Sequence, residues 1–317
     1  MPQVAAATYD GAVTYDIRKL PENERPSWIV QRRERLRVLL LGAGERPQVL
    51  EAAAQFRPLI EREVDILVTD FEGASDLSGI ESDLAVVFGG DGSILRAAKQ
   101  MGSRQVPVLG VNLGKLGFLA DIAAEEFPAV FTAVCAGQCR IVEHLMLLCR
   151  VERAGKVLHE RFALNELSVL AGPPFTMVNI DLYVDSELAT TYSCDGLIVS
   201  TPVGSTAHSL SAGGPILRKD LQACVISPIS PHTLTVRPVV DSADHVFELE
   251  VRQPNEGTAV VVDGRQVCCL EPRDRVSVRR AEPRFKLIEV RGRGYYRTLR
   301  EKLGWSGDIR RRVKGEE

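Results

Sequence analysis

The segment LAVVFGGDGSILRAAKQ, residues 84–100, has the side chains and spacing that most clearly suggest chemistry. An apolar run ends at Phe88, and the glycines after it, which let the backbone turn sharply and approach a ligand, are Gly89, Gly90 and Gly92. Ser93 would be a good N-cap for a following helix, whose start offers free N–H groups and a positive dipole end to phosphate. The pattern predicts an anion-binding loop between a strand and a helix.

Asp91 stands among these glycines and brings a negative charge to a place where phosphate would bind. A carboxylate beside such a loop can accept the proton of an attacking hydroxyl, or help to hold a cation that neutralises the phosphates. Amide donors next to an acidic acceptor are what phosphoryl transfer to an alcohol requires. The alternative is a plain strand-to-helix turn in which Asp91 bonds to nearby backbone, and the loop alone does not decide between the two.

Two common nucleotide-binding motifs are missing from the sequence. No segment matches the phosphate-binding motif G-x-x-x-x-G-K-[ST], and the loop lacks the third glycine of G-x-G-x-x-G. In LLLGAGERP, residues 39–47, Pro47 takes the place of that third glycine. These departures argue against a dinucleotide-dependent dehydrogenase.

Two features of the second half could complete a nucleotide site. Asn165 and Glu166 interrupt an apolar run, and an adjacent carboxamide and carboxylate could hold the two hydroxyls of a ribose, although a turn or strand end is the alternative. Residues 193–217 are rich in Ser, Thr and Gly, with Asp195 and His208 as the potentially charged groups. Such a segment could surround a polar small molecule with hydroxyl and backbone groups, or it could be an ordinary Ser/Thr loop.

The positioning elements fall into two regions. In the first, apolar strands without polar alternation are separated by helices, which indicates a parallel sheet in an α/β layer. The strands are expected over 37–44, 64–70, 83–90 and 106–112, and the helices over 47–63 and 93–102. After about residue 140, β-branched and alternating segments between Gly, Pro, Asn and Asp turns predict a mainly β domain. The cleft between the two domains is then the expected ligand site.

We expect four parts along the chain: an N-terminal arm over 1–36, an α/β domain over 37–140, a β-rich domain over 141–284, and a C-terminal segment over 285–317 that packs back on the first domain. With 45% hydrophobic and 26% charged residues and a formal net charge of -3, the chain has no global electrostatic reason to bind nucleic acid or anionic membrane. Seven cysteines without paired C-x-x-C spacing, and no run typical of secretion or membrane spanning, favour a cytoplasmic protein.

The motifs resemble those of the NAD kinase family. They occur in order from about residue 37 to 305, and they are GGDG, NLGKLGFLAD at 112–121, NE at 165–166, DGLIVSTPVGSTAHSLSAGGPI, ISPISPHTLTVRPVV at 226–240, VDGRQ at 262–266 and LREKLGW at 299–305. The resemblance implies an α/β domain followed by a β-rich domain. It also implies transfer of a phosphoryl group from ATP, or from inorganic polyphosphate, to the adenosine 2′-hydroxyl of NAD, which yields NADP.

The resemblance also implies roles for individual residues. Asp91 matches the proposed general base, Asn165 and Glu166 match a pair that contacts ribose, and Phe118 could reach the ligand. The other matches are Asp195 at the nicotinamide end and Thr206, Ala207 and Ser211 on the adenine side. Implied as well are a divalent cation, expected to be Mg²⁺ with unidentified protein ligands, and assembly as a dimer or tetramer.

Two positions depart from the family pattern, and two other functions stay open. Ser93 stands where Thr is common, a mild change that keeps the hydroxyl. His208 stands where a Tyr stacks on adenine, so the preference for phosphoryl donor or acceptor could differ. A lipid kinase of the diacylglycerol or sphingosine type shares a similar loop, but it would need an apolar pocket in place of the hydroxyl-rich segment. A dinucleotide sensor without activity would not need Asp91, Asn165 and Glu166 together.

Overall fold

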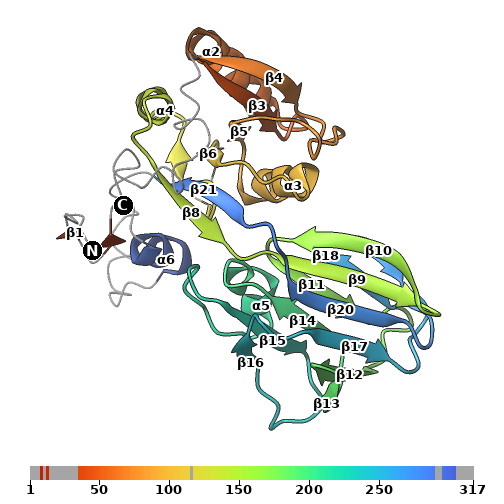
Figure 1. The fold of residues 1–317 in the computed structure, drawn as a ribbon. Coiled ribbons are helices and arrows are strands. Elements are labelled where there is room, and N and C mark those ends of the chain that lie inside the picture. Colours follow the sequence, from red (N-terminus) through yellow and green to blue (C-terminus); the bar gives the residue numbers. More distant parts are fainter. Residues whose placement is uncertain (1–7, 10–11, 14–34, 115–116, 290–294, 305–317) are drawn as a thin grey trace, which may run out of the picture.

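A computed structural model describes residues 8–9, 12–13, 35–114, 117–289 and 295–304 (Figure 1). Most of the arm expected over 1–36 lies outside these residues, and its described part includes a short antiparallel pair of β1 (Thr8–Tyr9) and β2 (Ala12–Val13). The rest of the chain forms a lobe of strands and helices and a second lobe made mainly of strands. The expected combination of an α/β region and a β-rich region is confirmed.

The first lobe is built on a seven-stranded sheet in the order β4-β3-β5-β6-β21-β8, with β7 paired to β6. Its strands are β3 (Leu36–Gly42), β4 (Val64–Asp70), β5 (Leu84–Phe88), β6 (Val108–Asn112), β7 (Ile122–Ala123), β8 (Arg140–His144) and β21 (Phe285–Glu289). All pairings are parallel except that of β8 with β21. The parallel sheet predicted for this half of the chain is therefore present.

Helices cover both faces of this sheet, which explains why its central strands carry no polar alternation. The helices α2 (Pro47–Glu63) and α4 (Phe127–Cys135) pack on one face, and α3 (Asp91–Met101) packs on the other. Along β3, Val38 and Leu40 join the first of these cores, whereas Leu39 and Leu41 join the second. Because α3 packs on one face of the sheet and begins directly after β5, the glycine loop lies at the end of that strand.

The second lobe consists of two antiparallel six-stranded sheets around one core. The first has the order β10-β9-β20-β17-β12-β13, with β9 (Leu147–Arg153), β10 (Lys156–Ala163), β12 (Val178–Val184), β13 (Glu187–Cys194), β17 (Phe247–Val251) and β20 (Arg275–Arg280). The second has the order β16-β15-β14-β11-β18-β19, with β11 (Glu166–Leu170), β14 (Gly196–Ser200), β15 (Ala223–Ile229), β16 (Val239–Ser242), β18 (Ala259–Val262) and β19 (Arg265–Cys269). Two short helices, η3 (Gly204–Thr206) and α5 (His208–Ser211), follow β14.

The chain crosses between the lobes more than once. After β20 it returns to the first lobe, where β21 lies between β6 and β8, and then forms α6 (Tyr295–Leu303) (Figure 1). The strand β8, which spans the boundary expected at 140/141, also belongs to the first sheet. Residues late in the sequence can therefore reach the glycine loop. Within the described ranges, no helix combines the length and apolar character needed to cross a membrane.

Candidate active site

The glycine loop has the strand-to-helix geometry predicted from the sequence, with one correction. Gly89 has φ of 139°, and a Cβ added there would lie 2.2 Å from Ser93 Oγ. Gly90 is the N-cap and α3 begins at Asp91, so the interpretation of Ser93 as the N-cap is wrong. Ser93 lies inside the first turn with its buried hydroxyl turned toward Gly89, because the helix starts directly after the glycine turn.

The outer side of the loop is open. A Cβ added at Gly90 or at Gly92 would have no neighbouring atom within 4 Å. The first N–H groups of α3 have no intrahelical acceptor, and the helix dipole adds positive potential at this end. An anionic group can therefore approach the backbone here without steric hindrance from the described residues.

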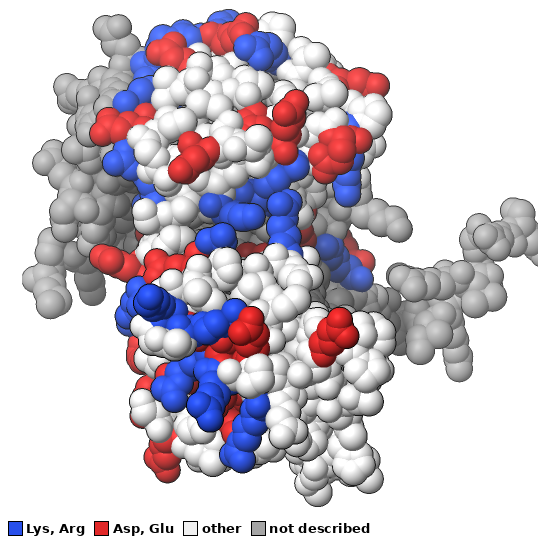
Figure 2. All heavy atoms as spheres, turned by 90° about the vertical axis from the view of Figure 1, so that its right-hand side faces the viewer, with Lys and Arg blue, Asp and Glu red and all other residues white. Residues whose placement is uncertain are grey.

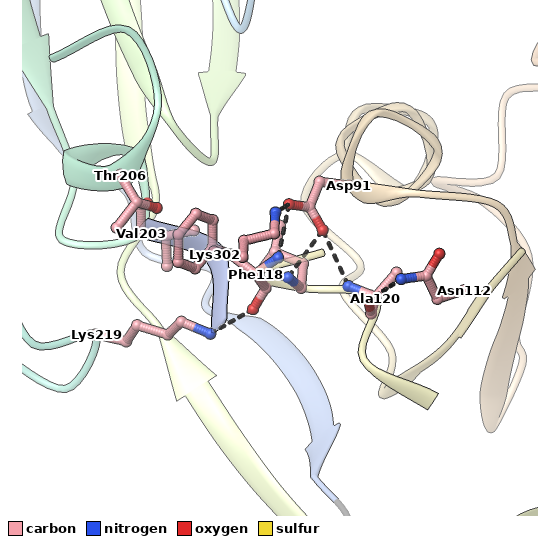
Figure 3. A network of polar contacts seen from close by, with 9 residues as sticks. Asp91, Asn112, Phe118, Ala120, Val203, Thr206, Lys219 and Lys302 are labelled. Atoms are coloured by element: carbon pink, nitrogen blue, oxygen red, sulfur yellow. Dashed lines mark hydrogen bonds and ion pairs between the residues drawn. The ribbon is translucent and has the colours of Figure 1, made fainter. Parts of the chain in front are cut away.

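The Asp91 carboxylate bonds to a loop far along the sequence, and not to its own turn (Figure 3). Asp91 Oδ2 accepts the backbone N–H of Phe118 at 2.8 Å, and Oδ1 accepts those of Leu119 and Ala120 at 2.9 and 3.1 Å. Gly117 is required beside it, since an added Cβ would lie 2.2 Å from Asp91 Oδ1. The local-turn alternative for Asp91 is therefore wrong, and the carboxylate holds residues 117–120 against α3.

Two lysines from distant segments complete this network (Figure 3). Lys302 in α6 places its Nζ 3.6 Å from Asp91 Oδ2 and 4.2 Å from the centroid of the Phe118 ring. Lys219 Nζ donates to the Phe118 carbonyl oxygen at 2.5 Å. Burial lowers the pKa of Lys219. The negative charges of Glu289, Asp121 and Asp91 act in the opposite direction and limit this decrease. The acid is thus surrounded by donors and cations and can lie close to phosphate without strong repulsion.

A second carboxylate, that of Asp263, orders the Asn165–Glu166 segment in the same manner. Asp263 Oδ1 accepts the backbone N–H groups of Asn165 and Glu166 at 2.8 and 3.1 Å, and Oδ2 accepts that of Leu164 at 2.9 Å. Gly204 packs against this segment so closely that an added Cβ would lie 2.1 Å from the Asn165 carbonyl oxygen. The backbone of the Asn165–Glu166 pair is therefore fixed, and its side chains are presented from a rigid strand end.

Glu166 is a buried acid with an unused oxygen. The residue is 6% exposed, its carboxylate accepts the His208 backbone N–H, and its buried Oε2 has no hydrogen-bond partner among the described residues. Burial, and then the negative charge of Asp263, raise the pKa of Glu166 to about 8. Asn165 is half-buried, and no hydrogen bond of its carboxamide involves a described residue. Both side chains have acceptor or donor capacity left for a ligand.

The hydroxyl-rich segment serves two purposes. Most of its hydroxyls are buried and bonded internally: Ser200, Thr201, Ser205 and Ser209. Thr206 at the end of η3, whose hydroxyl donates to the Val203 carbonyl oxygen at 3.1 Å, is half-buried, as are Ala207 and His208 at the start of α5. Ser211 at the end of α5 is exposed. The expectation that the whole segment faces a ligand is therefore too broad, and the half-buried residues at the start of α5 are the ones placed to meet one.

The two lobes bring most of the expected residues together. Leu119 beside Phe118 shares one buried cluster with Leu164 and Val203, which precede Asn165 and Gly204 in the chain. Asp195 is the exception. Glu166 pairs with Ser200, and Asp195 stands five residues before Ser200, so Asp195 lies about 17 Å from Glu166 along the strands, at roughly 3.4 Å per residue.

Three residues at the site had no role in the sequence interpretation: Lys219, Asp263 and Lys302. The motifs VDGRQ and LREKLGW contained two of them and were the available signal. Lys219 stands in a loop without a motif, and only the fold shows where its ammonium lies. Among the described residues, no three His, Cys, Asp or Glu side chains meet to hold a metal ion.

Comparison with known families matches both lobes. Residues 42–139 match the model of the ATP-NAD kinase N-terminal domain, and residues 164–290 match that of the ATP-NAD kinase C-terminal domain. A curated NAD kinase of Rhodopirellula baltica is 55% identical over 273 residues, which cover 86% of this chain and 88% of that protein. The NAD kinase of Nitrosomonas eutropha is 33% identical over 286 residues, covering 86% and 96%.

Solved structures agree with this assignment. A yeast NADH kinase complexed with NADH superposes with a TM-score of 0.80 over 88% of this chain and 90% of that chain, and at 24% identity it supports the fold. An NAD kinase from Archaeoglobus fulgidus in complex with ATP has a TM-score of 0.70, 25% identity, and coverage of 86% and 100%. With both lobes matched by the family models and a relative 55% identical over 86% of this chain, the chain belongs to the NAD kinase family.

Proposed function

We infer that this protein transfers the terminal phosphoryl group of ATP to the adenosine 2′-hydroxyl of NAD and produces NADP. The family membership supports this activity. The observation that carries it is the position of Asp91, whose carboxylate stands at the start of α3 beside an open glycine loop and is held by the backbone of residues 118–120. The comparisons give no support to a lipid kinase or to a sensor without activity.

The chemistry requires one bond to form and one to break. The 2′-oxygen attacks the γ-phosphorus, the bond from that phosphorus to the β,γ-bridging oxygen breaks, and ADP leaves with the electron pair. We propose that Asp91 takes the hydroxyl proton. Its two oxygens offer about four lone-pair sites, and three are used by the N–H groups of residues 118–120, so one is left for the hydroxyl. The same three bonds hold the acid in one orientation, which favours the reaction.

The other expected residues would bind the two substrates. The N–H groups at Gly90 and Gly92 would hold phosphate oxygens at the start of α3. Asn165 and the unpartnered Oε2 of Glu166 would hold ribose hydroxyls. Thr206, Ala207 and His208 would line the adenine side, and Ser211 would lie at the outer edge of that surface. Phe118 is held in place by Lys302 and would form a wall of the cleft.

Mg²⁺ is the expected cation, and the described residues provide no protein cage for it. The Asp91 oxygens already accept three N–H groups. We therefore propose that Mg²⁺ enters with the donor and keeps phosphate and water as its main ligands, as is common for this ion. When bound, it would neutralise phosphate charge.

The family resemblance supports assembly into a dimer or tetramer, and cytoplasmic localisation is proposed because the seven cysteines have no paired spacing. Large apolar side chains are exposed on the second lobe, and the most exposed are Leu234 at 88% and Phe175 at 75%. Apolar side chains scattered singly over a surface are ordinary, so the proposed oligomer rests on the family resemblance. Size-exclusion chromatography with light scattering would give the number of subunits.

The assay for the activity is direct. The purified protein is mixed with NAD, ATP and MgCl₂, and NADP is measured with a dehydrogenase that accepts only NADP. NADP formation that depends on both substrates supports the proposal. Release of ADP with diacylglycerol or sphingosine in place of NAD, and no NADP, would overturn it in favour of a lipid kinase. Tight NAD binding without any product would indicate a sensor.

A further inference from the structure

The cations between the two lobes are not all alike. Figure 2 shows Lys and Arg side chains gathered across the waist of the molecule, on the side that carries α3 and β10. A cleft of about 340 Å³ opens there, and the basic residues of its lining are Arg96, Lys99, Arg161 and Arg265. Lys219 is placed differently, since it is half-buried and its ammonium donates to a backbone carbonyl oxygen. Its role therefore needs a separate explanation.

Lys219 connects the two lobes. It stands in the second lobe, in the loop between α5 and β15. This loop is attached to its own lobe, because the backbone N–H of Leu217 donates to the buried Ser205 Oγ at 2.9 Å. The Lys219 Nζ, in contrast, lies 2.5 Å from the carbonyl oxygen of Phe118 in the first lobe. A backbone segment fixed on one lobe thus holds a backbone carbonyl of the other.

A single peptide unit joins the Lys219 ammonium to the Asp91 carboxylate. The Phe118 carbonyl accepts from Lys219, and the Leu119 N–H of the same peptide unit donates to Asp91 Oδ1 at 2.9 Å. Because the unit is planar, its oxygen and its hydrogen point in opposite directions, and Lys219 and Asp91 lie on opposite sides of it (Figure 3). A cation at the oxygen polarises the unit and strengthens the hydrogen bond that its N–H donates.

Charged groups from several segments act on the Lys219 ammonium. The negative charges of Glu289 at the end of β21, of Asp121 and of Asp91 favour its protonated form. The positive charge of Lys302 in α6 opposes that form. Burial has the largest effect, and it lowers the pKa of Lys219 from the ordinary value of 10.5. Lys219 therefore loses its proton at a lower pH than a free lysine does.

The buried ring of His144 supports the backbone of Lys219. His144 is the last residue of β8, stacks on Phe285 with the ring centroids 6.4 Å apart, and places Nδ1 3.5 Å from the Lys219 carbonyl oxygen. Burial, and then the positive charge of Lys219, lower the pKa of His144 to about 4. The imidazole is therefore neutral at neutral pH and does not repel the ammonium.

We propose that Lys219 is a positioning residue, which holds the 118–119 peptide and through it keeps the Asp91 carboxylate in the orientation for proton transfer. The proposal rests on the function given above and adds a residue on which that function depends. Since Lys219 belongs to the second lobe, it ties the base to the lobe that presents Asn165 and Glu166. The alternative is a lysine that only stabilises the junction of the lobes, and the two roles differ in their effect on turnover.

The first test measures the loop that Lys219 holds. Hydrogen exchange of the backbone amides of residues 118–120 is followed by mass spectrometry in the wild type, Lys219→Met and Lys219→Arg. The amides should exchange about tenfold faster in Lys219→Met, because a charge-assisted hydrogen bond is lost. Lys219→Arg keeps the charge and should stay within about threefold of the wild type. The matched control is Lys156→Met, which removes an exposed lysine at the start of β10 and should change nothing.

Turnover separates a positioning role from a stabilising one. Lys219→Met should lower kcat about tenfold while the KM values for NAD and ATP stay within about twofold, and Lys219→Arg should restore most of kcat. The kcat of Lys219→Arg divided by that of the wild type should rise about twofold or more between about pH 7 and about pH 10. The reason is that the guanidinium keeps its proton while Lys219 loses its own.

The outcomes distinguish this proposal from the proposed function. Unchanged exchange of residues 118–120 in Lys219→Met overturns the proposal, even where NADP is formed. Faster exchange with an unchanged kcat, or a kcat ratio that stays flat over this pH range, also overturns it, because Lys219 then only stabilises the junction of the lobes. Faster exchange in Lys219→Met, with no NADP from the wild type, supports the connection between Lys219 and the Asp91 loop and overturns the kinase function.

Discussion

Asp91 accepts the backbone N–H of Phe118 at 2.8 Å, although the two residues are 27 positions apart in the chain. The acid therefore anchors a loop in addition to its proposed role in proton transfer. Any substitution of Asp91 is therefore expected to affect both the anchoring of this loop and the proton transfer. The distinction is experimentally accessible, because loop anchoring changes stability whereas loss of a base changes turnover.

Asp91→Asn should lower kcat by roughly 10²- to 10⁴-fold, as expected when a positioned base is lost. The Asn side chain keeps one oxygen for Leu119 and Ala120 but turns an NH₂ group toward the Phe118 N–H. We expect a modest decrease in Tm and an NAD affinity within a fewfold of the wild type. Steady-state kinetics, calorimetry and thermal melts measure the three quantities.

Glu51→Gln is the matched control for Asp91→Asn, since it removes a carboxylate from an exposed position on α2. It should leave kcat, NAD affinity and Tm unchanged. Near-normal turnover of Asp91→Asn would show that Asp91 acts only as a loop anchor. In that case another group must accept the proton.

Two glycines of the loop should respond in opposite ways to substitution by alanine. Gly89→Ala places a Cβ at φ of 139° and 2.2 Å from Ser93 Oγ, so it should destabilise the fold by about 1–3 kcal/mol. Gly92→Ala meets no atom within 4 Å and lies inside α3, so it should stabilise the helix by about 0.5–1 kcal/mol. Urea denaturation measures both changes.

Activity of the two alanine variants gives an independent check. Although Gly92→Ala should be more stable, its added methyl group projects into the open space where the donor phosphate is proposed to approach. We therefore expect a higher KM for the donor and an unchanged KM for NAD. An unchanged donor KM in Gly92→Ala would place the phosphates elsewhere.

The sequence predicts the two-region fold because burial on both faces of a parallel sheet leaves a clear record. Runs such as Val38 to Leu41 carry no polar alternation, since consecutive side chains enter two different cores. By contrast, nothing in the five residues of β21 indicates that this strand lies between β6 and β8. Pairing over such a distance in the chain is a property of the whole fold and not of the local sequence.

The functional site can be predicted from the sequence where a residue's role is set by the backbone conformation that its type allows. Gly89 qualifies, because its positive φ and the close approach of Ser93 are features that a glycine in a tight turn predicts. Ser93 shows the limit: a serine near a helix start suggests an N-cap, but the helix begins two residues earlier. Lys302 and Lys219 were missed because an isolated lysine gives no indication of the carboxylate or carbonyl that it will meet.

His208→Tyr tests the adenine side of the cleft. His208 is half-buried at the first position of α5, and its backbone N–H reaches Glu166, a contact that the substitution retains. The larger aromatic face should tighten binding of adenine-containing ligands about two- to tenfold, while kcat stays within about threefold. Calorimetry with NAD measures the affinity. His232→Tyr, at an exposed turn, is the control, and a flat affinity for His208→Tyr means that residue 208 does not touch the base.

Glu166 should make stability and NAD binding depend on pH. Its pKa is about 8 in the folded protein against 4.5 for the free side chain, so the folded state holds the proton more tightly than the unfolded state. The contribution of this group to the free energy of unfolding is therefore fully present below about pH 4.5 and is lost as pH rises to about 8. Burial also raises the pKa of Asp263, so part of the profile belongs to that neighbour.

The variant Glu166→Gln separates the contribution of Glu166 to the pH dependence of stability from that of Asp263. Because the amide does not titrate, the stability of the variant relative to the wild type should increase between about pH 5 and pH 8, measured by urea denaturation at several pH values. Ribose hydroxyls that donate to Oε2 favour the ionised acid, so NAD binding at pH 7 should release a proton from the wild type and not from the variant. Calorimetry in two buffers with different ionisation enthalpies detects this release. Equal proton release from both proteins would show that Glu166 does not receive a ribose hydroxyl.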